Sequence, residues 1–234
     1  MTVPMNLWTR STRAVWVAAG ALLCAAGAGV GGCNIAAPAF FLIDGPPKTK
    51  SVATLDPEKK YVVVVDDPEN MLPSRSLRAE IASMAEKTIL NKGLAKVVLD
   101  HRAAMVVTSK ERFGEQLSIS EVGQAVGADM VIHVGIEMFA LSPDNSTYRP
   151  YSILRVKLVD VAERKRTWPE GERGGSGWPV NVALKTQQGA PPGSLAETMK
   201  ACGVLAGECG LAVAQLFYDH ENTTRAGAAT TISQ

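Results

Sequence analysis

Cys33 is the residue of this sequence best placed to do covalent chemistry. It follows Val30, Gly31 and Gly32, an apolar residue and two of the smallest residues. A cysteine thiolate is a nucleophile, and it can take up a diacylglyceryl group while the small residues before it let the backbone enter a peptidase cleft. The spacing therefore predicts cleavage before Cys33 and a lipid on its sulfur.

The segment before Cys33 has the layout of a secretory leader. Arg10 and Arg13 lie in a stretch without acidic residues, and the apolar run 14–28 follows them. A short basic region before a short apolar region is typical of a signal peptide, whereas a membrane-spanning helix needs roughly 20 apolar residues. Together with residues 30–33 the segment resembles a bacterial lipobox, which implies a palmitate-bearing lipoprotein in the cell envelope.

Two alternatives to lipidation stay open, an uncleaved membrane anchor and ordinary cleaved secretion. Cys24 is a poor lipid site because the bulky Leu23 precedes it. Asn34 follows Cys33; since an aspartate at that position commonly keeps lipoproteins at the inner membrane, Asn34 favours the outer membrane. We therefore expect a lipoprotein of the outer membrane that faces the periplasm.

The charge balance bears on the class of partner. The chain has 234 residues with 24 basic and 23 acidic side chains, and removing residues 1–32 leaves 202 residues with 22 basic and 23 acidic. A nucleic-acid binder needs a basic excess to neutralise phosphates, so this class is excluded. A domain of this size buries enough surface to fold without a metal or a disulfide.

Four parts are expected along the chain: a lipoprotein signal peptide over 1–32, a lipid-anchored tether over 33–60, an α/β domain over 61–220 and a disordered tail over 221–234. The strand at 61–65 (YVVVV) has the continuous β-branched pattern of a strand buried on both faces. A helix over 75–92, stopped by Gly93, and a strand over 95–99 are expected to follow. The segment over 100–113 suits either a helix or a strand, and we take it as a helix. A capped helix is expected over 118–127.

The second half of the domain is expected to begin with an antiparallel hairpin. Residues 129–139 and 151–161 alternate apolar and polar side chains and are joined by a polar loop. In this register Glu137 would face Arg155 across the pair. A short strand over 164–168, a glycine-rich loop over 171–177 and a long amphipathic helix over 195–218 complete the prediction: an α/β sandwich of two or three layers, with a mixed sheet of about four to five strands.

Two short phrases carry a resemblance to an envelope family. They are Val126 to Ile132, leading into the first hairpin strand, and Leu158 to Val161, before Trp168 and Pro169. With the order of elements, they resemble the α/β domain shared by the curli-secretion lipoprotein and the amino-terminal domain of the Tol translocation protein TolB. The resemblance implies the domain fold. It does not carry over pore or propeller functions, because this chain has neither long barrel hairpins nor a propeller after the last helix.

Residue types with catalytic or metal-binding capacity are scattered. His133 and Glu137 lie on one strand face but about 13 Å apart by strand rise, too far for a hydrogen-bonded dyad. Asp66 and Asp67 follow a strand, where such a pair usually makes a turn. Cys202 and Cys209 lie two turns apart on the last helix, too distant to bridge within it, and are expected to be buried hydrophobes. We predict no catalytic residue, no metal and no cofactor.

Trp168 and Trp178 flank the glycine-rich loop and are the candidate partner-binding residues. Each could instead cover an end of the core, and both interpretations stay open. The leading hypothesis is a non-enzymatic periplasmic accessory or assembly component that contacts the membrane through Cys33 and other envelope proteins through its domain. The alternatives are a periplasmic small-ligand-binding or hydrolytic enzyme and a structural envelope lipoprotein. The sequence leaves the oligomeric state open.

Overall fold

A computed structural model of the chain describes residues 48–109, 117–142, 147–171, 176–184 and 191–221, together with the backbone of 228–231. The predicted signal peptide, Cys33, Asn34 and residues 35–47 lie outside the described residues. The account below therefore concerns the domain that begins at Lys48.

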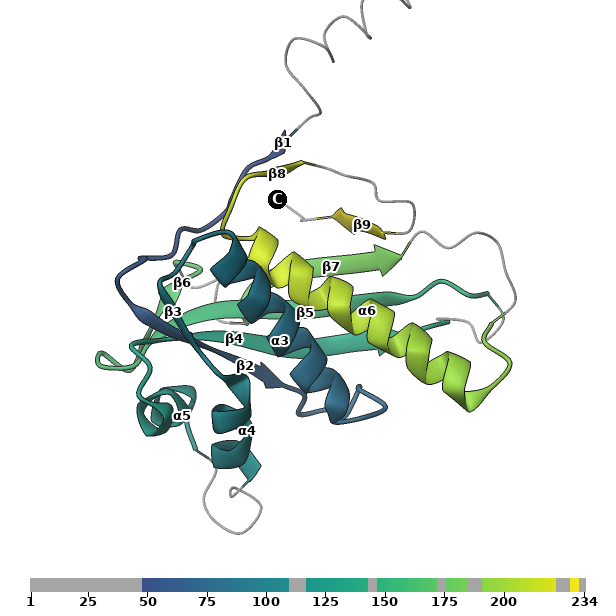
Figure 1. The fold of residues 1–234 in the computed structure, drawn as a ribbon, viewed down its shortest axis with the longest axis horizontal. Coiled ribbons are helices and arrows are strands. Elements are labelled where there is room, and N and C mark those ends of the chain that lie inside the picture. The colour runs from purple at the N-terminus through teal and green to yellow at the C-terminus, as the bar shows by residue number, and fades with distance from the viewer. Residues whose placement is uncertain are drawn as a thin grey trace, which may run out of the picture. The chain divides into compact units, whose positions relative to one another are not determined.

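The centre of the domain is a mixed β-sheet (Figure 1). Its strands run in the order β3-β2-β4-β5-β7-β9, and β6 also pairs with β5. β2 is parallel to β3 and β4, whereas the pairs from β4 to β9 are antiparallel. The strands are β2 (Lys60–Asp66), β3 (Val97–Leu99), β4 (Met130–Ala140), β5 (Tyr151–Asp160), β6 (Lys165–Trp168), β7 (Trp178–Leu184) and β9 (Ala228–Thr231).

Two long helices cover one face of this sheet (Figure 1), which we call the first face. They are α3 (Ser76–Asn91) and α6 (Leu195–Gln215). Their buried side chains join those of alternate strand residues, among them Val63, Ile132 and Leu154, in the main hydrophobic core. The α/β class, the antiparallel hairpin and the long helix near the C-terminus are thus confirmed.

The two long helices lie close together at Gly210. A Cβ atom on Gly210 would collide with the carbonyl oxygen of Ile81 and lie 2.7 Å from Cβ of Met84. The residue must therefore be glycine for the helices to reach their observed separation. Ser194 and Glu197 form a complete capping box at the start of α6, as predicted.

Within the described ranges, helices cover the opposite face, which we call the second face, at one end only. There α4 (His101–Ser109) and α5 (Ile119–Val126) pack against Val62, Val131 and Val159 in a second, smaller core. The predicted helix within 100–113 is confirmed. The capping box of Ser118 and the left-handed Gly127 bound α5, also as predicted.

The hairpin of β4 and β5 contains a β-bulge. Ile136 pairs with Leu154 and Met138 pairs with Ile153, so Glu137 is the extra residue on β4. A bulge inserts one unpaired residue and turns its side chain. Because of it, the alternation expected for residues 129–139 changes phase after Ile136.

The structure adds to the sequence prediction in three places. Residues 178–184, to which the sequence analysis assigned no element, form β7 and extend the mixed sheet. Residues 48–60, expected to be tether, already belong to the domain: Leu55 is buried in the main core, and the amide of Val52 donates to the carbonyl of Leu216. Residues 221–234, expected to be a disordered tail, contribute β9, which pairs with β7.

Each of these differences arises from pairing between residues distant in sequence. The edge of β7 offers free backbone groups that β9 satisfies. In the same way β1 (Lys48–Thr49) pairs with β8 (His220–Glu221), which joins the start of the domain to the segment after α6. Within the described ranges, no helix combines the length and the apolar character needed to cross a bilayer.

Candidate functional site

The two predicted partner-binding tryptophans lie side by side. Trp168 on β6 is opposite Leu158 of β5, and Trp178 on β7 is opposite Val156 of the same strand. Their ring centroids are 5.5 Å apart, and Trp168 also meets the ring of Phe217 edge-on at 6.3 Å. Both indoles are half-buried and pack against the main core. The fold thus brings the two tryptophans together in one aromatic cluster.

This aromatic cluster keeps one polar atom without a partner. Nε1 of Trp178 is buried and makes no hydrogen bond. A buried N–H donor without an acceptor is unfavourable by about 1–3 kcal/mol. The indole ring is therefore held at this place by its apolar contacts and not by a hydrogen bond.

The two cysteines of α6 are buried and unbridged, as predicted. Burial raises the pKa of the Cys209 thiol to about 12, and burial also raises the pKa of Cys202. Both thiols are thus protonated at neutral pH and behave as small apolar side chains.

Asp67 acts as the turn residue that the sequence suggested. Its carboxylate is almost completely buried and accepts the amides of Met71 at 2.7 Å and Leu72 at 3.1 Å. Arg78 of α3 approaches the same carboxylate at 3.5 Å. The turn after β2 is therefore fixed to the first helix of the fold.

Asp66 turns to the second face and lies beside His133. Oδ2 of Asp66 is 3.7 Å from Nε2 of His133, and the imidazole lowers the pKa of the carboxyl group. The sequence analysis considered only Glu137 as an acidic partner of His133 and judged it too far away for a hydrogen bond. Glu137 contacts Arg155, whose Nε lies 2.8 Å from Oε1, so the predicted cross-strand ion pair is confirmed.

His133 is almost completely buried, although its position allowed a solvent-facing side chain. Its Nδ1 atom has no hydrogen-bond partner. Beside it, the atoms nearest to the position that a Cβ on Gly135 would take belong to His133 and Arg155 and are 3.8 to 3.9 Å away, an ordinary van der Waals distance.

A cluster of Glu86, Asp100 and His101 was missed by the sequence analysis. One potential metal-ligand atom from each residue lies within 4.8 Å of the other two. Glu86 accepts the backbone N–H of His101 and contacts its Nδ1, both at 2.8 Å, while Asp100 accepts the amide of Arg102. These hydrogen bonds cap α4 and attach it to α3, which accounts for all three side chains. Burial raises the pKa of Glu86, opposed by His101.

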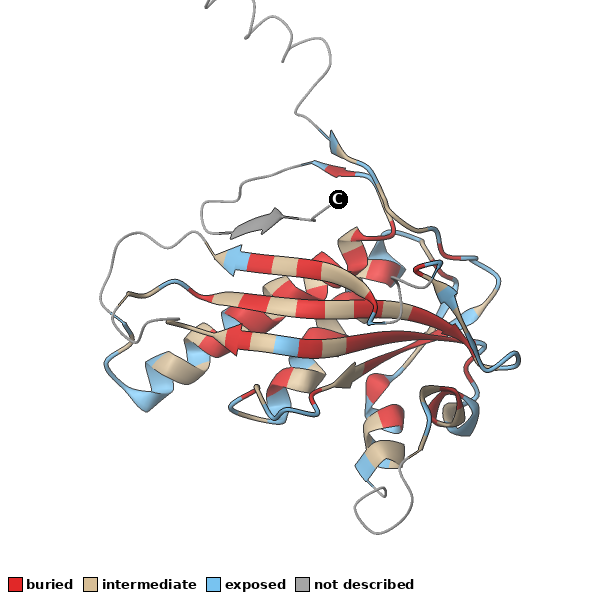
Figure 2. Ribbon diagram, turned by 180° about the vertical axis from the view of Figure 1, so that it is seen from behind, coloured by how far each residue is buried: buried red, intermediate tan, exposed pale blue. Residues whose placement is uncertain are grey.

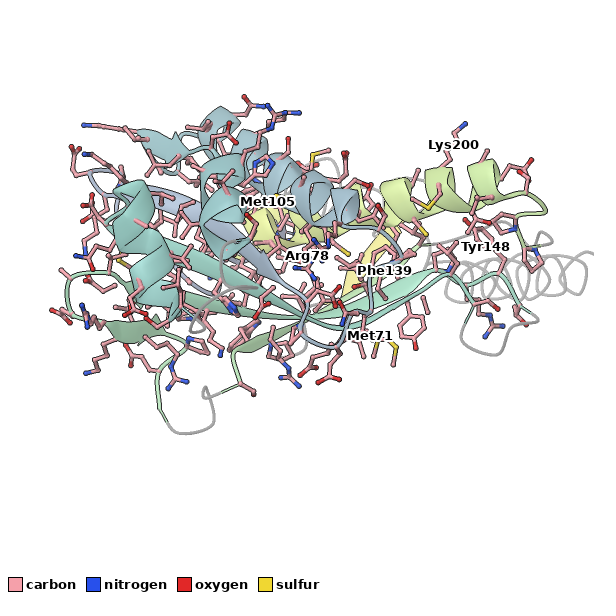
Figure 3. All side chains as sticks on the ribbon, turned by 90° about the horizontal axis from the view of Figure 1, so that it is seen from below. Met71, Arg78, Met105, Phe139, Tyr148 and Lys200 are labelled. Atoms are coloured by element: carbon pink, nitrogen blue, oxygen red, sulfur yellow. The ribbon has the colours of Figure 1, made fainter. Side chains whose placement is uncertain are left out.

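One open cavity of about 440 Å³ lies at the N-terminal end of α6. Its volume is in the range of small-ligand sites. Figure 3 shows Tyr148 on one side of this helix and Lys200 pointing away from it. The lining consists of Tyr148, Pro191, Pro192, Gly193, Glu197, Lys200, Ala201 and Val204.

Comparison with known proteins yields structural neighbours but no sequence relatives. No family model matches the chain, and no curated protein matches it. The PelC dodecamer from Paraburkholderia phytofirmans is 13% identical, with 73% of this chain and 91% of that chain covered and a TM-score of 0.37. Hypothetical protein CT253 from Chlamydia trachomatis is 12% identical, with 67% of this chain and 93% of that chain covered and a TM-score of 0.42.

A lipoprotein is also among these neighbours. GNA1162 from Neisseria meningitidis is 10% identical, with 62% of this chain and 94% of that chain covered and a TM-score of 0.37. The resemblance to the curli-secretion and Tol proteins is not shown by these comparisons and stays a prediction.

Proposed function

We propose that this chain is an outer-membrane lipoprotein, lipidated on Cys33, whose domain faces the periplasm and acts through contacts with other envelope proteins. The observation that carries the proposal is the run Val30-Gly31-Gly32-Cys33 after a basic and then an apolar region. The thiol at that position is the group that the lipid requires, and the residues before it suit cleavage.

The distance between the lipid site and the domain supports action close to the membrane. Residues 34–47 separate Cys33 from β1. A segment of this length spans at most about 50 Å when fully extended. A partner of the domain would therefore be another component of the same membrane or of the adjacent periplasm.

The environments of the reactive residue types support a role without catalysis. Asp67 holds a turn, Glu86 caps α4, Glu137 pairs with Arg155, and Cys209 has a pKa of about 12. Each group has a structural contact that accounts for its position.

Cross-linking in whole cells, followed by identification of the captured proteins, tests the protein-contact part of this function. We expect one envelope protein to be captured reproducibly by the wild type and lost when Cys33→Ala releases the domain from the membrane. Cys24→Ala is the matched control and should keep the capture. Absence of any reproducible partner would favour a structural envelope protein instead.

The cavity beside α6 favours a second candidate function, the binding of a small ligand. Glu197 is engaged in the capping box, whereas Lys200 is exposed at the rim. An apolar ligand with a carboxylate group suits this lining. A thermal-shift screen of such compounds tests it: a rise in melting temperature that Lys200→Ala abolishes would support ligand binding, and no rise would exclude this class.

A further inference from the structure

The domain begins with seven residues that make few buried contacts. Residues 48–54 lead from the segment after Cys33 to the core, and we call them the strap. None of them is buried, and Figure 2 accordingly colours them tan and pale blue. Leu55, which follows directly, is only 5% exposed and belongs to the main core. The first firmly packed side chain of the domain is therefore Leu55.

Hydrogen bonds to the end of α6 and the segment after it hold the strap in place. The amides of Val52 and Ala53 both donate to the carbonyl of Leu216, at 2.9 and 3.1 Å. The amide of Ser51 donates to Oδ1 of Asp219 at 2.9 Å, in an exposed position. The side chains of Val52 and Ala53 pack against the main core and remain partly exposed. These contacts fix the position of the strap but bury little of it.

The first residues of the strap pair with β8 in a small sheet of their own (Figure 1). Lys48 is opposite Glu221 and Thr49 is opposite His220. An isolated pair of strands is at best marginally stable in water, and each of these strands has only two residues. The pairing therefore adds a weak attachment that is separate from the main sheet.

The attachment becomes firm at the end of the strap. The amide of Asp56 donates to the hydroxyl of Tyr61 at 2.8 Å, and Tyr61 is only 2% exposed. Segments with few buried apolar contacts and exposed hydrogen bonds open at a much lower free energy than the core of a protein. Thr54 and Leu55 therefore mark the boundary between a weakly and a firmly held part of the chain.

We propose that the strap is a releasable part of the tether, which separates from β8 and Leu216 while the domain from Leu55 onward stays folded. Release adds seven residues to the 14 residues between Cys33 and β1. The greatest distance between the lipid site and the domain then grows by about 25 Å. This consequence rests on the proposed lipid anchor: the closed strap keeps the domain near the membrane, and the open strap lets it reach a more distant partner.

Hydrogen exchange of the full-length chain in detergent tests the release. The amides of Val52 and Ala53 are hydrogen-bonded in the closed strap, so their exchange reports its opening. We expect them to exchange on the order of a hundredfold faster than the amide of Val62, a fully buried residue of β2. Equal rates would overturn the proposal, because the strap would then open only together with the whole domain.

A disulfide between β1 and β8 allows the same molecule to be compared closed and open. Thr49 and His220 face each other, and facing Cα atoms of antiparallel strands are about 4.5–5.5 Å apart, which a disulfide can bridge. In the variant Thr49→Cys with His220→Cys, oxidation should slow the exchange of the two strap amides, and reduction should restore it. Cys202 and Cys209 are buried and should not interfere. Exchange that oxidation leaves unchanged would contradict opening from β8.

Val52→Pro tests the release from the other direction, because it removes an N–H that donates to Leu216. We expect the amide of Ala53 to lose its protection while the melting temperature of the domain stays nearly unchanged. Val64→Pro in β2 is the matched control and should unfold the domain. A large fall in the melting temperature of Val52→Pro would overturn the proposal.

The wild-type exchange rates and Val52→Pro decide the question if the disulfide variant does not fold. A chain without a lipid on Cys33 would lose its membrane attachment, but its strap would exchange as before. Failure of the proposed function and failure of the releasable strap are therefore distinguishable.

Discussion

The guanidinium of Arg155 lies 2.8 Å from the carboxylate of Glu137, although these residues are not directly opposite each other in the sheet. Arg155 is opposite Gly135, and the bulge at Glu137 carries the acidic side chain to the same face. The ion pair predicted from sequence is therefore formed through a bulge that the sequence did not predict.

This ion pair should contribute little to stability. Glu137 is 44% exposed and Arg155 is 31% exposed, so water and salt screen their attraction. We expect Glu137→Gln to lower the free energy of unfolding by no more than about 1 kcal/mol. Chemical denaturation at low and high salt measures this, and a larger loss that persists in high salt would contradict a screened surface pair.

Gly210→Ala should destabilise the contact between α3 and α6. The new methyl group would collide with the carbonyl oxygen of Ile81, and separating the helices should cost about 1–3 kcal/mol. Gly203→Ala is the matched control in the same helix, because nothing lies within 4 Å of its Cβ position. The control should stabilise the helix by up to about 1 kcal/mol. Equal effects of the two substitutions in denaturation experiments would contradict the close packing.

Asp160 should stabilise the domain at neutral pH and lose this effect in acid. Its carboxylate accepts the amide of Glu163 and the ammonium of Lys59, both at 3.0 Å, and these contacts lower its pKa. A group with a lowered pKa in the folded state stabilises above its unfolded pKa, and the effect disappears as pH falls through the folded pKa.

Asp160→Asn should therefore cost about 1–2 kcal/mol at neutral pH. The difference from the wild type should shrink in acid below the folded-state pKa of this carboxyl group. Urea denaturation of both proteins, at neutral pH and in acid, measures this difference in the free energy of unfolding. A difference that stays constant would show that the carboxylate charge is not what matters.

Trp178→Ala should lower stability, because the indole contacts Trp168 and the main core. We expect a loss of about 2–3 kcal/mol, below the range for fully buried rings. Trp178→Phe should retain part of the aromatic contact and lose less. An alanine variant with unchanged melting that no longer captures an envelope partner would instead support the partner-binding role predicted from the sequence.

Local signals in the sequence predicted most of the elements. The β-branched run of β2 occurs where a strand is buried on both faces, with Val62 and Val63 both inaccessible. The capping boxes at Ser118 and Ser194 place the starts of two helices correctly, because the hydrogen bonds that they make lie within four residues.

Contacts between distant segments could not be predicted in this way. β7 contains Pro179 and follows a glycine-rich stretch, so its local pattern favours a loop, and only pairing with β5 makes it a strand. Trp168 and Trp178 meet because both of their strands pair with the same stretch of β5. Glu86 of α3 caps α4 by accepting the backbone N–H of His101. This contact likewise depends on tertiary packing, so no periodic pattern in the sequence indicates it.

Mass spectrometry of the N-terminal peptide of the full-length protein, isolated from its native cells, tests the lipid anchor most directly. The account predicts a peptide that begins at Cys33 and carries fatty acyl groups, with membrane association lost in Cys33→Ala and kept in Cys24→Ala. A water-soluble chain that retains residues 1–32 and an unmodified Cys33 would contradict it.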